Sequence, residues 1–222
     1  MNSPRFYMAQ EEAYKVLLKY SDGKLPIDPF KIIKKIKNIK LMTYTEFAIK
    51  LQEKDPSLSI KEIRESFKSD RGFLTKKGNK KYILAYNDED PLFVIWWTLF
   101  HELGHYFLKH LVKKNKTLYY NEVQKKSPIE KEADCFARHC SSPFPIIKIV
   151  AEETNFTNDE DLSFLFYYMY QMGNKVIKRC TEHFRKYSHY YGKEKYEGLV
   201  TKFTKSILKT EIFIYNHFIF ID

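Results

Sequence analysis

The segment that constrains this chain most is a long helix, predicted from Pro91 to about Leu111, whose first half is almost entirely apolar. Asp90 followed by Pro91 is typical of a helix start, because proline suits the first helical position. The run from Leu92 to Phe100 is much shorter than the roughly 18 apolar residues that a membrane-spanning helix needs. We therefore expect this helix to be anchored in the core of a packed domain.

The second half of this helix contains the pattern HELGH, with His101, Glu102 and His105. Residues four apart lie on one helical face, so both imidazoles can bind one metal ion. Glu102 lies beside that face, where its carboxylate can take a proton from the attacking water. Gly104 lowers helix stability by roughly 1 kcal/mol relative to alanine, which indicates a close neighbouring backbone or a substrate strand. His110 lies about 140° around a continuous helix from His105 and is expected to have a surface or packing role.

A third metal ligand is expected downstream, because catalytic zinc sites usually have three protein ligands and one open position. A helix predicted to open at Ser127-Pro128 and to end near residue 142 contains the sequence EKEAD. We assign Glu130 as the ligand, and Asp134, one turn later, as the acceptor of a hydrogen bond that fixes the tautomer of a ligand histidine. One alternative stays open. Ser127 and Glu130 have capping-box spacing, so Glu130 could cap its own helix and leave Glu132 as the ligand.

Around these two helices the sequence predicts an α+β fold, in which a small mixed or antiparallel sheet packs on the active-site helix. Residues 1–150 are expected to form the metallopeptidase domain, and residues 151–222 a helical C-terminal subdomain with a terminal strand. The predicted strands are Ile39–Tyr44, Gly72–Thr75 and Lys81–Tyr86. The other predicted helices cover residues 8–20, a segment that starts at Asp28-Pro29, and residues 59–67, 157–189 and 193–208.

Composition limits the classes of function. The net charge of +10 is spread over short lysine clusters with interleaved acidic residues, which favours ordinary solvated faces over steering toward an acidic or nucleic-acid-bound partner. No recognition helix with base-reading side chains is evident, so direct nucleic-acid binding is not expected.

The N-terminus has acidic residues where the apolar core of a secretory signal would begin. The three cysteines, Cys135, Cys140 and Cys180, suit the thiols of a reducing compartment. Together these features predict a cytoplasmic protein.

The blocks TLFHELGHYFLKH and EKEADCFARHCSSP resemble the ImmA/IrrE family of metallopeptidases. Upstream, LPIDPFKIIKKI resembles a helix start of the family, and YILAYND resembles the strand before its active-site helix. The resemblance covers roughly residues 10 to 145. Two stretches depart from the family pattern without touching a ligand: Trp97–Phe100 before the motif, and Cys140–Pro143, where the family has Leu-Leu-Met-Pro. Local packing and any substrate contact at these positions are therefore expected to differ from those of the family.

The resemblance implies a zincin-like fold with a glutamate-zincin metal site that holds zinc, with manganese as an alternative. It also implies an endopeptidase that cleaves a helix-turn-helix transcriptional repressor, and so derepresses a mobile-element, prophage or stress-response operon. A second hypothesis is a metal-containing binding protein or toxin–antitoxin component that sequesters a repressor without cleaving it. The presence of Glu102 beside both histidines favours the enzyme, because sequestration needs no general base.

Overall fold

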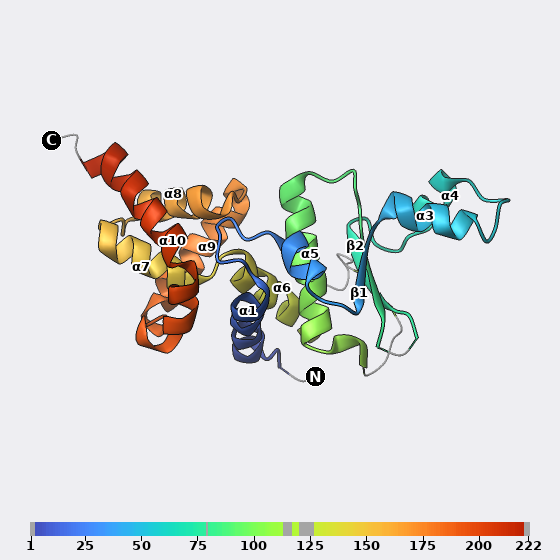
Figure 1. The fold of residues 1–222 in the computed structure, drawn as a ribbon, viewed down its shortest axis with the longest axis horizontal. Coiled ribbons are helices and arrows are strands. Elements are labelled where there is room, and N and C mark those ends of the chain that lie inside the picture. The colour runs from blue at the N-terminus through green and yellow to red at the C-terminus, as the bar shows by residue number, and fades with distance from the viewer. Residues whose placement is uncertain (1–2, 79, 113–116, 120–126, 220–222) are drawn as a thin grey trace. The chain divides into compact units, whose positions relative to one another are not determined.

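The computed structural model of this protein describes residues 3–78, 80–112, 117–119 and 127–219. The chain divides into two compact units. The first unit contains Met1–Ala13 and Pro29–Ala137, and the second contains Tyr14–Asp28 and Arg138–Asp222. Two helices contribute residues to both units: α1 (Phe6–Tyr20) and α6 (Pro128–Ser141) (Figure 1).

The first unit contains a mixed sheet, which confirms the α+β fold expected from the sequence. Its four described strands have the order β1-β3-β2-β4. β1 runs parallel to β3, and the other neighbouring strands are antiparallel. Three of the strands were predicted, and β4 is an addition. The strands are β1 (Ile39–Thr43), β2 (Gly72–Lys76), β3 (Tyr82–Tyr86) and β4 (Thr117–Tyr119).

One face of this sheet packs against helix α5 (Leu92–Phe107), which Figure 1 shows in green beside the strands. Leu74 of β2 lies opposite Leu84 of β3, and both are fully buried. Gly72 points to the same face as Leu74, because alternate residues of a strand share a face. A Cβ atom on Gly72 would clash with the methyl group of Thr98 in α5. The glycine therefore lets the active-site helix approach the sheet closely.

The opposite face of the sheet packs against an aromatic cluster. Phe73 and Ala85, which are paired across β2 and β3, are buried together with Tyr44. Phe47 and Phe67 pack against this group from outside the sheet. The sheet is thus covered on both faces, by α5 on one and by this aromatic cluster on the other.

Two helices on this side start with a capping box. In this motif the side chain of the N-cap residue accepts a hydrogen bond from the backbone N–H three residues later, and the side chain of that later residue accepts one from the N-cap backbone N–H. In α4 (Ile60–Glu65) the box joins Ser59 and Glu62, as predicted. In α3 (Tyr44–Gln52) the box joins Thr43 and Glu46. Helix α3 was not predicted, although its first residues have the same spacing as those of α4.

The helices around the motif residues agree with the sequence at their starts. Helix α2 (Pro29–Lys34) begins at the proline that was expected to open it, and packs against α5. Helix α6 begins at Pro128, also as expected. Helix α5 ends earlier than predicted, at Phe107, because Lys109 adopts a left-handed conformation with φ of 59°. A 3-10 turn, η1 (His110–Val112), follows it.

The described part of the second unit is helical. Helix α7 packs against α10, and α8 packs against α9. Phe144, Phe166 and Phe203 are fully buried in its core. The three cysteines, Cys135 of the first unit and Cys140 and Cys180 of the second, are buried and form no disulfide among the described residues. The helices are α7 (Phe144–Thr154), α8 (Asp159–Tyr170), α9 (Asn174–Tyr187) and α10 (Glu197–Ile214), with short turns η3 (Ser188–Tyr190), η4 (Glu194–Tyr196) and η5 (Tyr215–Ile219).

Two predictions for this unit are wrong. The single helix expected over residues 157–189 is broken between α8 and α9, where Gln171 is left-handed and Gly173 caps the next helix. The terminal strand is absent from the described residues, because residues 211–219 continue in helical form. Ile207 and Ile214, about two helical turns apart, are both buried, whereas Ile212 is 58% exposed. This spacing is that of a helix that covers a core with one face.

The described helices include none that is both long and apolar enough to cross a membrane.

Candidate metal centre

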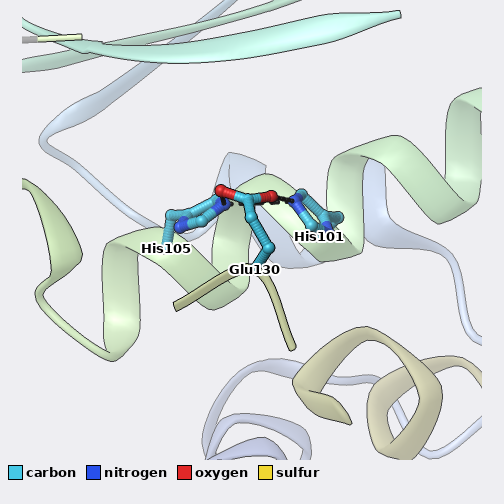
Figure 2. A group of neighbouring side chains, drawn as sticks. All are labelled: His101, His105 and Glu130. Carbon is cyan, nitrogen blue, oxygen red and sulfur yellow. Dashed lines mark hydrogen bonds and ion pairs between the residues drawn. The ribbon is translucent and has the colours of Figure 1, made fainter. Parts of the chain in front are cut away.

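His101 and His105 of α5 meet Glu130 of α6 in a buried group (Figure 2). The Nε2 atoms of the two histidines are 3.0 Å apart. Glu130 Oε2 lies 3.1 Å from His101 Nε2, and Glu130 Oε1 lies 3.4 Å from His105 Nε2. In Figure 2 the carboxylate of Glu130 lies between the two imidazoles. None of the three side chains is more than 1% exposed. Residues from two helices thus converge where solvent does not reach.

The spacing of these atoms fits a tetrahedral metal ion. Zinc bonds of about 2.0 to 2.1 Å to nitrogen and oxygen separate two tetrahedral ligand atoms by about 3.3 Å. The two histidine nitrogens are 3.0 Å apart, and each lies 3.1 or 3.4 Å from one of the two oxygens of Glu130, which are separations close to this value. Two imidazole nitrogens and one carboxylate are also a common donor set for catalytic zinc. The residues present therefore fit the metal that the motif predicts.

Small residues bring the two helices together. A Cβ atom on Gly104 of α5 would lie 3.0 Å from the Cα of Ala133 in α6 and 3.2 Å from its carbonyl oxygen. The glycine between the two histidines therefore permits a close approach of α6, as the sequence suggested. Glu130 lies one helical turn before Ala133, so this contact directs its carboxylate toward α5.

The two uses considered for Glu130 can now be compared. The backbone N–H of Glu130 donates to Ser127 Oγ at 3.4 Å, which is one half of a capping box. Its carboxylate, however, contacts the two histidines. The alternative residue, Glu132, lies outside the group and accepts hydrogen bonds from Arg5 instead. The geometry therefore favours Glu130 over Glu132.

Asp134 lies on the outer side of the same group. Its Oδ1 atom is 2.9 Å from His101 Nδ1. An Nδ1–H that donates to Asp134 leaves the Nε2 lone pair of His101 free to face Glu130 and His105. This is the contact that the sequence predicted for an aspartate four residues after Glu130.

Glu102 is fully buried beside the three donors. Neither of its carboxylate oxygens accepts a hydrogen bond from a described side chain, although the backbone of Leu74 is close enough to lower its pKa. Burial raises the pKa of Glu102 to about 8, although the charge of His101 opposes this effect. Buried carboxylate oxygens are rarely left without a partner. A bound metal ion with a water molecule would supply such partners.

The protonation of the metal-free group follows from its contacts. Burial opposes charge on His101, but hydrogen bonds with Asp134 and Glu130 raise its pKa to about 9. Burial lowers the pKa of His105 to about 4. Burial also opposes charge on Glu130, but the two histidines lower its pKa to about 2. Glu130 and His105 thus already have the forms that bind a metal, whereas His101 must lose a proton.

His110 is the residue of this region that the sequence placed wrongly. The angle of about 140° assumed a continuous helix, but α5 ends at Phe107 and the chain turns back at Lys109. As a result, His110 Nδ1 lies 2.8 Å from His105 Nδ1. No local signal predicts this turn, because lysine rarely takes the left-handed conformation.

Residues 46–153 match the family model of the IrrE N-terminal-like domain, Peptidase_M78. Comparison with curated proteins and with solved structures gives no match. The matched segment contains α5 and α6, and therefore each residue of the buried group. The match and the buried group together identify residues 46–153 as an IrrE N-terminal-like domain, which is the Peptidase_M78 domain of the ImmA/IrrE family of metallopeptidases.

Proposed function

We propose that this protein is a zinc-dependent endopeptidase in which His101, His105 and Glu130 bind the metal and Glu102 is the general base. The observation that supports this proposal most is the convergence of three buried metal donors next to Glu102, whose fully buried carboxylate accepts no hydrogen bond from a described side chain. A structural carboxylate in the same place would be expected to accept hydrogen bonds from its neighbours.

Each residue has a distinct part in this chemistry. Zinc bound by the three donors supplies Lewis acidity, which lowers the pKa of water and polarises a carbonyl group. Glu102 takes the proton of the attacking water and returns it to the leaving amine. Asp134 holds the Nδ1–H of His101 and keeps its Nε2 lone pair on the inner side. Zinc suits the two nitrogen donors, and manganese is the alternative metal.

The family implies a protein substrate. We further propose that this substrate is a helix-turn-helix transcriptional repressor, whose cleavage derepresses a mobile-element, prophage or stress-response operon in the cytoplasm. Support comes from the likeness of the HELGH and EKEAD blocks to the family, and from the family match over residues 46–153.

The test compares the wild-type protein with Glu102→Gln. Zinc content is measured per chain, and cleavage is measured on the helix-turn-helix repressor encoded nearest to the gene. We expect about one zinc per chain in both proteins. Cleavage should fall by about 10² to 10⁴-fold in the variant, the usual contribution of a general base. Glu194→Gln, at an exposed position of the second unit, is the matched control and should leave both values unchanged.

Two other results would contradict parts of the proposal. If neither protein contains zinc, the assignment of the metal ligands is wrong. If wild type and variant both bind zinc and the repressor but neither cleaves it, the protein sequesters its partner instead of cutting it.

We also propose that the catalytic domain extends over residues 1–150 and is followed by a helical C-terminal subdomain, residues 151–222. The family match ends close to this boundary, at residue 153, although the boundary falls inside α7 and the second compact unit already includes the chain from Arg138. Limited proteolysis should then cut between α7 and α8 before it cuts within either domain. A first cut inside residues 29–112 would contradict this division.

A further inference from the structure

The two histidines of the metal centre have different partners on their outer side. His101 Nδ1 contacts a carboxylate directly, at 2.9 Å from Asp134 Oδ1. His105 Nδ1 instead contacts a third imidazole, at 2.8 Å from His110 Nδ1. His110 is not part of the group of three inner donors. Its side chain is nevertheless only 2% exposed, so it is built into the site and does not lie on the surface.

The contacts of His110 continue to a carboxylate. His110 Nε2 lies 3.1 Å from Glu132 Oε2. Glu132 is 3% exposed and accepts two hydrogen bonds from the Arg5 guanidinium, at 3.1 and 2.9 Å. The backbone N–H of Arg5 donates to the same carboxylate at 2.9 Å. A chain of contacts therefore runs from the N-terminal segment to His105.

The charge of Glu132 is well defined. The guanidinium of Arg5 and its backbone N–H donate to both oxygens of Glu132, so Glu132 is held as the anion of an ion pair. Glu132 is therefore a carboxylate at neutral pH and accepts hydrogen bonds without donating any. His110 must then carry a proton on the Nε2 atom that faces it.

The positions of the protons along this series of contacts follow from the charge of Glu132. A neutral imidazole has a proton on one nitrogen and a lone pair on the other. With its proton on Nε2, His110 has its Nδ1 lone pair directed at His105 Nδ1. His105 then donates from Nδ1, and its Nε2 lone pair faces Glu130 and His101. This is the tautomer that binds a metal through Nε2.

The backbone conformation that brings His110 to this place is unfavourable. Lys109 has φ of 59°, a left-handed conformation that residues with a side chain rarely adopt. The turn aims the imidazole of His110 inward at His105, whereas a continued helix would direct it elsewhere. The contact between the two histidines is thus a specific product of the fold.

We propose that His110 is a positioning residue for His105: it fixes the tautomer and the ring orientation of this metal ligand, and Glu132 and Arg5 in turn hold His110. The inference rests on the proposed metal centre and extends it to an outer carboxylate, Glu132, that matches Asp134 on the other histidine. Loss of such an outer partner typically weakens metal binding by about 10 to 100-fold.

The test measures zinc affinity by competition with a chelator, in a series at position 110. His110→Phe keeps a ring of similar size but accepts no hydrogen bond, and should weaken zinc binding by about 10-fold or more. His110→Asn retains an oxygen acceptor near the place of Nδ1 and should restore affinity to within about threefold of wild type. His189→Phe, at an exposed position of the second unit, is the control and should bind zinc like wild type.

A second readout does not depend on affinity. In the zinc-loaded wild type, the Nδ1–H proton of His105 should give a slowly exchanging NMR signal. The signal should be lost in His110→Phe and retained in His110→Asn. If His110→Phe does not fold, Glu132→Gln serves in its place and should also weaken zinc binding, because it removes the charged acceptor.

The outcomes separate the two proposals. A wild-type protein that binds no zinc contradicts the metal centre itself. A wild type that binds zinc, with a folded His110→Phe that binds it equally tightly, overturns the role of His110 alone. An Asn variant as weak as the Phe variant also overturns it, because the hydrogen bond would then not be the cause.

Discussion

Buried histidines occur in both units of this protein, and they have opposite surroundings. In the first unit, the contacts of His101 and His110 end at carboxylates, Asp134 and Glu132. In the second unit, His139 is 1% exposed and lies among aromatic rings. Its Nδ1 atom is 2.9 Å from the hydroxyl of Tyr14, and ring contacts come from residues Tyr14, Phe144, His183 and Tyr191.

The pKa values show what this difference does. Burial disfavours a charged imidazole at both places. At His101, the hydrogen bonds to Asp134 and Glu130 outweigh burial and raise the pKa to about 9. At His139, burial is joined by the positive charge of Arg138 and by His183, and the pKa falls well below 6.5. Carboxylate partners, and not burial, distinguish a histidine of the metal centre from a histidine of the core.

The largest expected effect comes from removing one histidine of each kind. His101→Ala should lose the metal completely, from about one zinc per chain to none. His139→Ala should keep its zinc but should unfold more easily, by about 2 to 4 kcal/mol, since it leaves a cavity among aromatic side chains. Zinc content and urea unfolding of the two variants measure this contrast. Loss of zinc from a folded His139→Ala protein would show that the two kinds of histidine are not independent.

A smaller effect is expected at two helical glycines, one in each unit. A Cβ on Gly104 would meet the backbone of Ala133 at 3.0 Å, whereas a Cβ on Gly198 would meet only the side chain of Leu18, at 3.7 Å. Gly104→Ala should therefore destabilise the protein by about 1 to 3 kcal/mol, despite the better helix propensity of alanine. Gly198→Ala should be neutral or stabilising by up to about 1 kcal/mol.

Thermal or urea unfolding compares the stability of the two glycine variants. The zinc affinity of Gly104→Ala is measured as well. We expect this affinity to fall too, because α6 carries Glu130. Equal stability of the two variants would mean that α6 does not approach α5 as closely as the structure has it.

The smallest expected effect is the acid sensitivity that His139 adds. Its folded-state pKa is below that of the unfolded chain, so the unfolded state takes up the proton first, and stability is lost as the pH falls below about 6.5. The free energy of unfolding falls by at most about 1.4 kcal/mol per pH unit through this group. His183, whose pKa burial lowers to about 4, acts in the same direction. The groups that face His139 are Tyr14, Arg138, His183 and Tyr191.

This slope is measured by urea unfolding of the metal-free protein at pH 7.0 and 5.5, in wild type and His139→Phe. The variant should lose less stability over this interval, because it has no proton to take up at that position. Contributions of the other histidines cancel in the difference between the two proteins. Identical losses would mean that His139 is accessible to protons in the folded state.

The sequence by itself determined the local part of the metal centre. His101 and His105 share a face of α5 because residues four apart in a helix do so. The same rule places Glu130 and Asp134 together on α6, and proline and capping signals located the starts of both helices and of α4. These features depend on neighbours in the chain, so their pattern can be read without knowledge of the fold.

Tertiary structure decided which groups meet across elements. The contact of Gly104 with Ala133 directs Glu130, and not Glu132, toward the histidines. The left-handed turn at Lys109 brings His110 to His105. Helical packing likewise replaced the strand expected at the C-terminal end of the described chain. Such contacts depend on the distance between backbones that are far apart in sequence, and no local periodicity encodes that distance.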